Sequence, residues 1–250
     1  ITGANGGLGR ALVARFERAG WQVHATDRST LDVTSEASVS AAKARLGVPD
    51  VVINIGGVGL LGTVAELPDE VLCQQLDINV RGLARVTRAF APEMCRRGHG
   101  RIVNVSSLVG VFTLPWFGAY AATKHAVEAL SDAMRLELRP HGVEVVVVEP
   151  SVVGTGFVDT AVASLARAAE GSLWKAELLA TIARREWANL VLLTPERVAE
   201  AIFRAASVSR PAARYRVGLL ASWLIRLAGL APRRLSDFLL RALFSPEPLS

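Results

Sequence analysis

The fold is decided by one stretch near the start of the chain, Thr2-Gly3-Ala4-Asn5-Gly6-Gly7-Leu8-Gly9. Its glycines permit positive φ angles and let the backbone approach a pyrophosphate closely. The helical repeat that follows offers unpaired N–H groups and the positive end of a helix dipole to an anion. Because the turn follows what looks like a strand end, it predicts a phosphate cradle at a strand-to-helix junction. A central first strand cannot be this short, so we expect it to be truncated at Ile1.

Apolar residues along the rest of the chain alternate between helix-like and strand-like patterns. Leu8, Leu12 and Phe16 recur at a helical spacing, and so do four residues from Val127 to Leu138, before a proline and a glycine end that helix. The strand-like runs are Gln22–Thr26, Val51–Asn54, Arg101–Val105, Val143–Val148 and Tyr215–Val217. The central runs are continuously apolar, which is typical of strands buried on both faces. The alternation predicts a Rossmann-type, doubly wound parallel sheet in a single α/β domain over residues 1–250.

Composition and charge narrow the class of protein. Of the 250 residues, 51% are apolar, which supports a substantial core. Cys73 and Cys95 form no CxxC pair and no cluster with zinc-ligand spacing, so we expect a cytoplasmic protein without a metal site. No apolar run reaches the roughly 20 residues that span a bilayer. The net charge of +5 falls on the segment from residue 210 onward, with seven arginines and two acidic residues, so nucleic acid is not an expected partner.

An acidic residue closes the second expected strand, at the position where a dinucleotide would present its adenosine ribose. The Asp27 carboxylate is placed to accept from two ribose hydroxyls and would repel a 2′-phosphate. Arg28 follows directly and would attract such a phosphate instead, so NAD is favoured and NADP stays open. Asp32 and Val33 begin the next loop, where we expect contact with the adenine edge; the alternative for Asp32 is a helix cap.

A phenol and an ammonium share one helix face in Tyr120-Ala121-Ala122-Thr123-Lys124, because residues i and i+4 are neighbours on a helix. A nearby positive charge favours the phenolate, so Lys124 is expected to lower a Tyr120 pKa that starts near ~10. A phenol adjusted in this way can give or take a proton near neutral pH. This chemistry suits a carbonyl or alcohol oxygen whose carbon exchanges a hydride.

The chain resembles the short-chain dehydrogenase/reductase family over nearly its whole length. Thr2, Gly3, Gly7 and Gly9 match the family's TGxxxGxG motif, and Tyr120 and Lys124 match its YxxxK motif. Ser107 matches the active-site serine, and Asn79 matches the asparagine of the catalytic tetrad. All of them occur in the right order and spacing. The resemblance implies that Tyr120 is the general acid in reduction and the general base in oxidation. Lys124 would also bind the nicotinamide ribose, Ser107 would bind the substrate oxygen, and Asn79 would hold a water in a proton relay.

The resemblance also implies a set of cofactor-binding residues. These are Gly3, Asn5, Gly7, Leu8, Gly9, Asp27, Arg28, Asp32, Val33, Asn54, Gly56, Tyr120, Lys124, Pro150, Val153 and Thr155. Two motifs depart from the family pattern: the usual NNAG is Asn54-Ile55-Gly56-Gly57 here, and the usual PG is Pro150-Ser151. The first change removes an amide, and the second adds a Cβ where the nicotinamide approaches. Both put cofactor affinity in doubt but leave the expected reaction type unchanged.

These motifs support three functional hypotheses. The first is an NAD(P)-dependent oxidoreductase that interconverts a hydrophobic secondary alcohol and its ketone, with Tyr120 as general acid and base. Residues 155–193 lie where relatives carry a substrate lid, and their apolar and aromatic character predicts a steroid, retinoid or fatty-chain substrate. The second hypothesis is a cofactor-binding sensor or scaffold that is weak or inactive in catalysis, as the altered motifs would allow. The third is a lyase or epimerase that oxidises its substrate transiently.

Two amphipathic repeats near the end of the chain predict a helical extension over residues 219–244. Their apolar faces and flanking arginines fit two interpretations. The favoured one is a pair of helices that cover the pocket or a subunit interface, and the other is peripheral contact with an anionic membrane surface. By resemblance to the family, we expect a homodimer or homotetramer paired through the helices that carry Asn79 and Tyr120.

Overall fold

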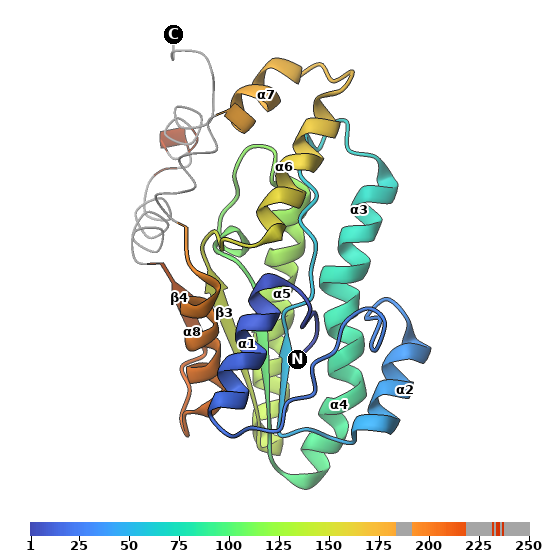
Figure 1. Ribbon diagram of the computed structural model, residues 1–250, viewed down its shortest axis with the longest axis vertical. Coiled ribbons are helices and arrows are strands. Elements are labelled where there is room, and N and C mark those ends of the chain that lie inside the picture. The colour runs from blue at the N-terminus through green and yellow to red at the C-terminus, as the bar shows by residue number, and fades with distance from the viewer. Residues whose placement is uncertain (184–191, 219–231, 233, 236, 238–250) are drawn as a thin grey trace.

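Four parallel strands form the central sheet of the computed structural model, which describes residues 1–183, 192–218, 232, 234, 235 and 237 (Figure 1). In spatial order, which is also chain order, they are β1 (Val51–Asn54), β2 (Gly100–Val105), β3 (Val143–Pro150) and β4 (Arg214–Val217). The register pairs Val52 with Ile102 and Ile102 with Val145. Four of the five predicted strands are therefore confirmed, with β3 two residues longer than expected.

The remaining predicted strand, Gln22–Thr26, which is the second in chain order after the truncated first one, is much shorter than predicted. Only Thr26 is bridged to a neighbouring segment. Thr2 bridges both Thr26 and Asn54 in parallel, so the start of the chain lies between the second expected strand and β1. The Ile1 nitrogen donates to the His24 carbonyl. The Thr26 N–H donates to the Ile1 carbonyl, and the Ala4 N–H donates to the Thr26 carbonyl. Apart from the bridge at Thr26, residues 22–25 form no regular ladder with the described residues.

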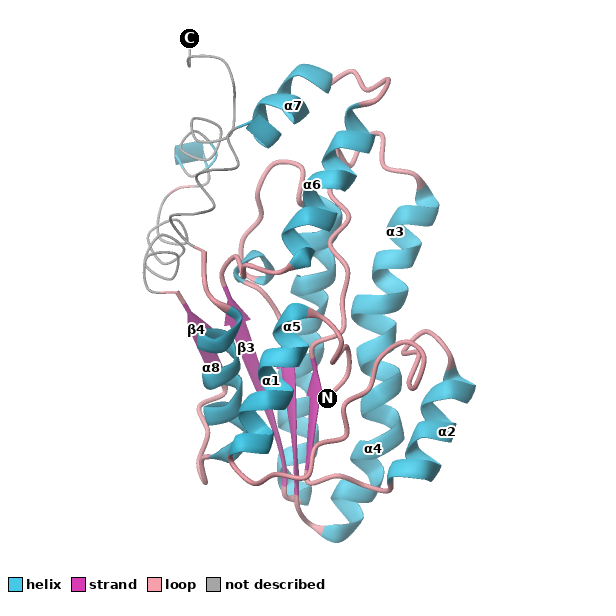
Figure 2. Cartoon of the chain, viewed as in Figure 1, coloured by secondary structure: helices cyan, strands magenta, loops and turns pink. Residues whose placement is uncertain are grey.

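Helices cover both faces of the sheet, as the doubly wound prediction requires (Figure 2). On one face, α1 (Gly7–Arg18) and α8 (Pro195–Ser207) pack against alternate strand residues such as Val103. On the other face, α2 (Glu36–Leu46), α4 (Leu83–Arg97) and α5 (Gly118–Leu138) pack with residues of the opposite parity such as Ile102. Val103 and Ile102 are fully buried, so successive side chains of one strand belong to two separate cores.

The elements that surround the site lie beyond the carboxyl ends of the strands, at the top of Figure 1. They are α3 (Asp69–Leu76), the π-helical turn η1 (Asp77–Gly82), the short η2 (Leu108–Gly110), α6 (Gly156–Ala169) and α7 (Lys175–Ala183). The expected lid at 155–193 thus includes α6 and α7, although Trp187 lies outside the described residues. A further turn, η3 (Arg139–His141), follows α5.

The predicted extension at 219–244 also lies outside the described residues, apart from 232, 234, 235 and 237. None of the helices within the described part of the chain has the length and apolar character needed to cross a membrane.

Two glycines meet at the amino edge of the sheet, where α4 ends and β3 begins. Gly98 and Gly142 have φ angles of 76° and 77°, and each closes a helix in the left-handed conformation. A Cβ atom on Gly142 would lie 1.9 Å from the Gly98 carbonyl oxygen. This contact therefore requires glycine for two reasons, the sign of φ and the lack of space.

The two reasons can be separated by comparing Gly142→Ala with Gly20→Ala. Gly20 has a φ angle of 79° but no heavy atom within 4 Å of a built Cβ. We expect Gly20→Ala to lower the free energy of unfolding by about 1–2 kcal/mol, from the φ angle alone. Gly142→Ala should cost roughly 1–3 kcal/mol more, because the backbone must move away from the carbonyl. Chemical denaturation measures the free energy of unfolding of both variants. If both lose the same amount, the backbone at Gly98 can move away from the added Cβ without a loss of stability.

Candidate active site

The glycine turn lies against the loop that follows β1. Gly3 has a φ angle of 70°, and a Cβ there would be 3.0 Å from the Gly56 Cα atom. A Cβ on Gly9 would lie 2.5 Å from the carbonyl oxygens of Gly3 and Ala4, so the turn folds tightly onto the start of α1. Gly6 is the N-cap of α1 and provides no side-chain cap. The first-turn N–H groups are therefore open to an anionic ligand, which fits a dinucleotide pyrophosphate.

A pocket of about 440 Å³ opens beside this turn, lined by Gly3, Asn5, Gly6, Asp27, Arg28 and Ser29. The Asp27 carboxylate accepts from the Ser29 N–H and hydroxyl at 2.9 and 2.6 Å, and from the Asn5 side-chain amide. The Ser29 side-chain hydrogen bond lowers the pKa of Asp27, so this group is ionised at neutral pH. Arg28 points to solvent, 90% exposed, with its Nε 3.5 Å from the Asp32 carboxylate. The groups of this pocket fit an adenosine ribose.

The residues expected at the adenine edge have other partners in the structure. Asp32 accepts from the Thr34 N–H and hydroxyl at 2.8 and 2.7 Å in a local turn, whereas the N-cap of α2 is Ser35, so the helix-cap alternative for Asp32 is wrong. Val33 packs against Gly82, where a Cβ would lie 2.7 Å from a Val33 methyl. Its carbonyl accepts from the Arg85 guanidinium at 3.1 Å.

A buried amide network joins the carboxyl end of β1 to β2 and α5. Asn54 donates to the Asn104 side-chain oxygen at 2.9 Å, and Asn104 donates to the Ser131 hydroxyl at 2.9 Å. Asn104 is fully buried. Ile55, in place of the family's second amide, packs against the core shared by α1 and α8. The sequence departure therefore leaves a cross-strand hydrogen bond in place, and sequence reasoning missed Asn104, which supplies it.

Tyr120 lies in the first turn of α5 and is buried, with 8% of its surface exposed. Its phenol lies beside the side chain of Ser107, which follows the end of β2. Burial raises the pKa of Tyr120, and the Ser107 hydrogen bond opposes that rise. We expected Lys124 to lower the pKa of Tyr120. The pKa is raised instead, because desolvation of the phenolate is the larger effect.

Lys124 lies one turn further along α5, with its ammonium 5.8 Å from the centre of the Tyr120 ring. The ammonium donates to the Val105 carbonyl at 3.0 Å. Burial lowers the pKa of Lys124 to about 8, and the charge of Glu128 works in the opposite direction. The structure therefore brings Ser107, Tyr120 and Lys124 together at the carboxyl end of β2.

Asn79 joins this group from η1, a π-helical turn between α3 and α4, and such turns are frequent at functional sites. Its side chain accepts from the Val58 N–H and donates to the Val58 carbonyl, both at 2.8 Å. It also donates to the Thr123 hydroxyl at 3.0 Å. Gly57 lies alongside, because a Cβ there would be 3.1 Å from the Asn79 oxygen and 3.8 Å from the Lys124 nitrogen. Thr123, which anchors Asn79 to α5, was not anticipated from the sequence.

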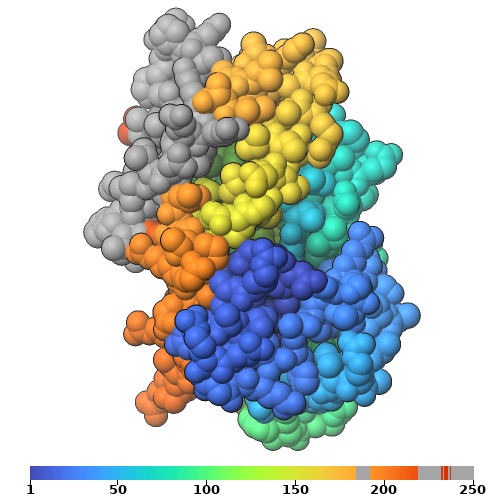
Figure 3. Space-filling view, viewed as in Figure 1, coloured from blue at the N-terminus to red at the C-terminus, as the bar shows by residue number. Residues whose placement is uncertain are grey.

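The start of α6 lies across the site (Figure 3, yellow over dark blue). A Cβ on Gly7 would lie 2.9 Å from the Thr155 methyl group, so Thr155 contacts the glycine turn directly. The Phe157 ring lies 5.5 Å from the Tyr120 ring, centre to centre. Upstream, Pro150 ends β3 and Val153 forms a parallel bridge with Leu193. The segment from Thr155 to Phe157 thus contacts both the glycine turn and the Tyr120 ring.

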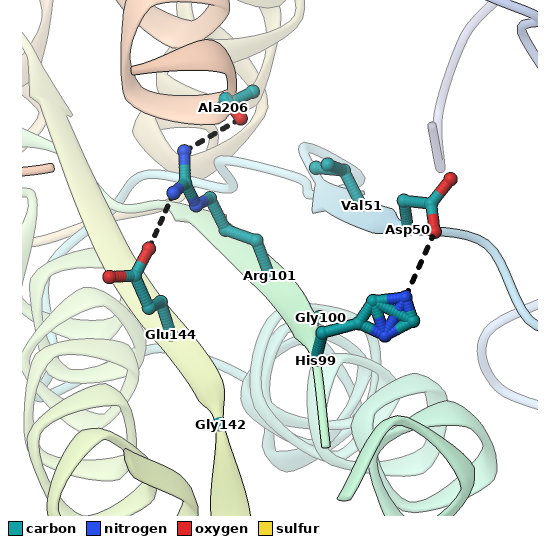
Figure 4. Close-up of a pocket in the computed structure, with 8 residues that line it drawn as sticks. All are labelled: Asp50, Val51, His99, Gly100, Arg101, Gly142, Glu144 and Ala206. Carbon is teal, nitrogen blue, oxygen red and sulfur yellow. Dashed lines mark hydrogen bonds and ion pairs between the residues drawn. The ribbon is translucent and has the colours of Figure 1, made fainter. Parts of the chain in front are cut away.

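A second pocket, of about 280 Å³, lies at the opposite edge of the sheet, at the amino ends of β1, β2 and β3 (Figure 4). Arg101 donates there to the Ala206 carbonyl at 2.7 Å and pairs with Glu144. His99 lies 4.0 Å from the Asp50 carboxylate. These groups close the end of α8 against the sheet, and none of the predicted site residues lines this pocket.

Comparison with known proteins gives a consistent family. A profile of the family described as short chain dehydrogenase matches residues 29–166, more than half of the chain. The 3-ketodihydrosphingosine reductase of Bacteroides thetaiotaomicron is 33% identical over 174 residues, or 64% of this chain and 65% of that protein. The chain thus matches slightly less than two thirds of that reductase. The uncharacterized oxidoreductase YbbO of Escherichia coli is 31% identical over 261 residues, or 96% of this chain and 93% of that protein.

Solved structures show the same fold with either nicotinamide cofactor. A short chain dehydrogenase/reductase from Burkholderia phymatum in complex with NAD is 26% identical, with a TM-score of 0.74 over 100% of this chain and 96% of that one. A serine dehydrogenase complexed with NADP+ is also 26% identical, with a TM-score of 0.72 over 87% of this chain and 92% of that one. The Rossmann-type prediction is therefore confirmed, and a nicotinamide cofactor is supported without a preference between the two.

The titration of Lys124 can be measured without turnover, because the chain has only three lysines, at positions 43, 124 and 175. In protein labelled with ¹³C-lysine, we expect the Lys124 Cε resonance to titrate with a midpoint near pH 8, because burial disfavours the ammonium. Lys43→Arg and Lys175→Arg each remove one signal and so assign the third. A Lys124 midpoint near its ordinary value of 10.5 would mean that water reaches the ammonium and that this description of the site is wrong.

Proposed function

Because the chain belongs to the short-chain dehydrogenase family, we propose that it is an NAD(P)-dependent oxidoreductase that interconverts a hydrophobic secondary alcohol and its ketone. One observation carries the proposal: the Tyr120 phenol lies beside the Ser107 side chain, one helical turn from Lys124. A phenol, a hydroxyl and an ammonium at the carboxyl edge of a Rossmann-type sheet are the groups needed to move a proton at a substrate oxygen.

In the direction of ketone reduction, each residue has one task. When bound, the nicotinamide supplies a hydride to the carbonyl carbon. Ser107 donates a hydrogen bond to the carbonyl oxygen, where negative charge develops. Tyr120 gives its proton to the same oxygen, and the resulting phenolate is stabilised by Lys124. Oxidation reverses these steps, with the phenolate taking the alcohol proton. Asn79 holds the start of η1 against α5 and is proposed to order the water that returns a proton to this group.

A hydrophobic substrate is supported by the surroundings of Tyr120. Its ring packs in a cluster of buried apolar residues that includes Leu61 from the loop after β1, Leu165 from α6 and Leu178 from α7. Phe157 borders the same ring and keeps 37% of its surface exposed, so it can provide an apolar wall to an incoming ligand. The matched reductase from Bacteroides is named for an amphiphilic ketone, 3-ketodihydrosphingosine. We therefore favour a fatty-chain or similarly apolar ketone over a small polar one.

The sensor or scaffold hypothesis differs from this proposal in one respect, because both need the cofactor cradle but only an enzyme needs a titrating phenol. The altered NNAG motif, which first suggested it, keeps its cross-strand hydrogen bond through Asn104. A sensor would bind a nicotinamide dinucleotide and never change its absorbance with any alcohol or ketone.

Assembly through the outer faces of α4 and α5 is proposed from the family resemblance. Leu136 on α5 is 66% exposed, which is a large apolar side chain left open to solvent. A homodimer or homotetramer would cover it.

The proton-transfer role predicts a sharp difference between the two tyrosines of the chain. We expect Tyr120→Phe to lower kcat by roughly 10²-fold to 10⁴-fold while dinucleotide binding is retained, because only the proton donor is lost. Tyr215→Phe is the matched control, since Tyr215 lies on β4 and its hydroxyl accepts from Ala212 N–H at 3.3 Å. The assay follows nicotinamide absorbance with a panel of apolar ketones and alcohols. An active Tyr120→Phe enzyme would exclude Tyr120 as the proton donor.

NAD preference is proposed from the position of Asp27 and predicts the effect of removing its charge. Asp27→Asn keeps an acceptor for Ser29 and Thr30 but no longer repels a 2′-phosphate. We expect the ratio of kcat/KM for NADP to that for NAD to rise by at least roughly tenfold. Arg28→Ala should leave kcat/KM for NAD nearly unchanged, since Arg28 is paired with Asp32. If only Arg28→Ala changes the ratio, and it does so by abolishing NADP use, the preference is for NADP.

A further inference from the structure

A third ionisable residue continues the line of Tyr120 and Lys124 along α5. Glu128 lies four residues beyond Lys124, so the three side chains share one face of the helix. Only 7% of Glu128 is exposed. A carboxylate is seldom buried unless it is paired, so this position needs an explanation.

The nearest charged partner of Glu128 comes from the last strand of the sheet. Arg214 on β4 places its Nε 3.2 Å from the Glu128 carboxylate. The same guanidinium lies 3.2 Å from Glu149, which is fully buried on β3, and 2.6 Å from Asp132 on the next turn of α5. Arg216 also pairs with Glu149, at 2.7 Å. Arg214 is therefore shared among three carboxylates, two of them buried.

The packing at the other side of Glu128 leads back to the catalytic lysine. Gly110 allows the approach, because a Cβ there would lie 2.6 Å from the Ser106 hydroxyl, 3.2 Å from the Lys124 carbonyl oxygen and 3.3 Å from Glu128 Cγ. The end of β2, the Lys124 turn and the Glu128 side chain thus meet around one glycine. The Glu128 carboxylate is held between Arg214 and the turn that carries the ammonium.

The Lys124 ammonium has few other sources of negative charge. It donates a hydrogen bond to a neutral group, the Val105 carbonyl. The acidic residue of η1, which packs on α5, is already engaged by two arginines, since Asp77 pairs with Arg81 of η1 at 3.0 Å and with Arg85 of α4 at 2.8 Å. On the sheet side, Glu149 is engaged by Arg214 and Arg216. Glu128 is the carboxylate on the same helix face, one turn away.

We propose that Glu128 is a positioning residue whose buried carboxylate supplies the counter-charge for the Lys124 ammonium, and that Arg214 keeps this carboxylate ionised. The proposal rests on the function proposed above only for the role of Lys124 in turnover. Glu128 and Arg214 then do more than stabilise the fold. They set the pH range over which Lys124, beside Tyr120, keeps its proton.

The titration behaviour of the two groups agrees with this geometry. Burial lowers the pKa of Lys124 to about 8, and the charge of Glu128 is what raises it against that effect. Burial also raises the pKa of Glu128, which the neighbouring Ser106 hydroxyl and Arg214 oppose. A lysine with a lowered pKa carries its charge below that pKa and loses it above. Removal of Glu128 should therefore shift the loss of charge to lower pH.

The experiment compares Glu128→Gln with the wild-type protein in the ¹³C-lysine titration. Glutamine has nearly the same shape, and Arg214 keeps Glu149 and Asp132 as partners, so the fold should persist. We expect the Lys124 midpoint to fall by roughly one pH unit, because an ionised carboxylate one helical turn away in a buried site stabilises an ammonium. In the assay, the alkaline limb of the kcat profile should shift downward by the same amount.

Asp132→Asn is the matched control. It removes another carboxylate from Arg214, at 42% side-chain exposure and two turns of helix from Lys124. It should leave the Lys124 midpoint in place, whereas a loss caused only by a disturbed Arg214 network would appear in both variants. Glu128→Asp, which keeps the charge, should recover much of the wild-type midpoint.

An unchanged Lys124 midpoint in folded Glu128→Gln protein would overturn the proposal, and so would equal shifts in Glu128→Gln and Asp132→Asn. Neither outcome depends on turnover, because the lysine signals are read from the protein alone. If the protein oxidises and reduces none of the tested compounds, the proposed function fails while the titration still decides the role of Glu128.

Discussion

The structure depends on keeping a positive charge in a place that water does not reach. The Lys124 ammonium is 6% exposed and meets a backbone carbonyl of β2 instead of solvent. Burial of an ammonium is costly unless carbonyl dipoles or carboxylates replace its hydration. The Val105 carbonyl at the end of β2 accepts a hydrogen bond from the ammonium, and Gly57 lies close to it. Glu128 lies one helical turn away on α5. The neighbouring phenol is as deeply buried, and this burial raises the pKa of Tyr120.

The fold brings these groups together because parallel strands end at one edge. Ser107 follows β2 and Thr155 follows β3, while Asn54 ends β1. The Asn54–Asn104–Ser131 network ties two of these strand ends to α5, the helix that carries Tyr120 and Lys124. The Asn79 amide ties the same helix to the loop after β1 through Val58 and Thr123. Hydrogen bonds between buried amides fix such distances more strictly than apolar packing, because a shift of about 1 Å breaks the hydrogen bond.

Sequence reasoning recovered the features that repeat or lie close together in the chain. The glycine turn, four of the strands and the spacing of Tyr120 and Lys124 follow from local rules, since helix periodicity and strand composition act over a few residues. Asn104, Thr123 and Arg214 were missed because their partners are 27 to 86 residues away, and nothing in an isolated asparagine or arginine identifies the partner. The direction of the Tyr120 pKa was also missed, because burial is a property of the packed molecule and not of the YxxxK spacing. The segment Gln22–Thr26 has the composition of a strand, but composition does not show how many of its residues are bridged to a neighbouring segment.

The start of α6 shows how closely the cofactor and substrate sides are connected. Thr155 accepts the Phe157 N–H as the N-cap of α6, so the two side chains are held two residues apart in a fixed conformation. The Thr155 methyl contacts Gly7 of the phosphate cradle, and the Phe157 ring contacts Gly59 and faces Tyr120. Under the proposed function, a dinucleotide seated along the glycine turn would need the space beside Gly7, and a ketone oxygen would need the space in front of the phenol. Because one cap fixes both side chains, a displacement of α6 that makes room for the first ligand also changes the position of the wall that meets the second.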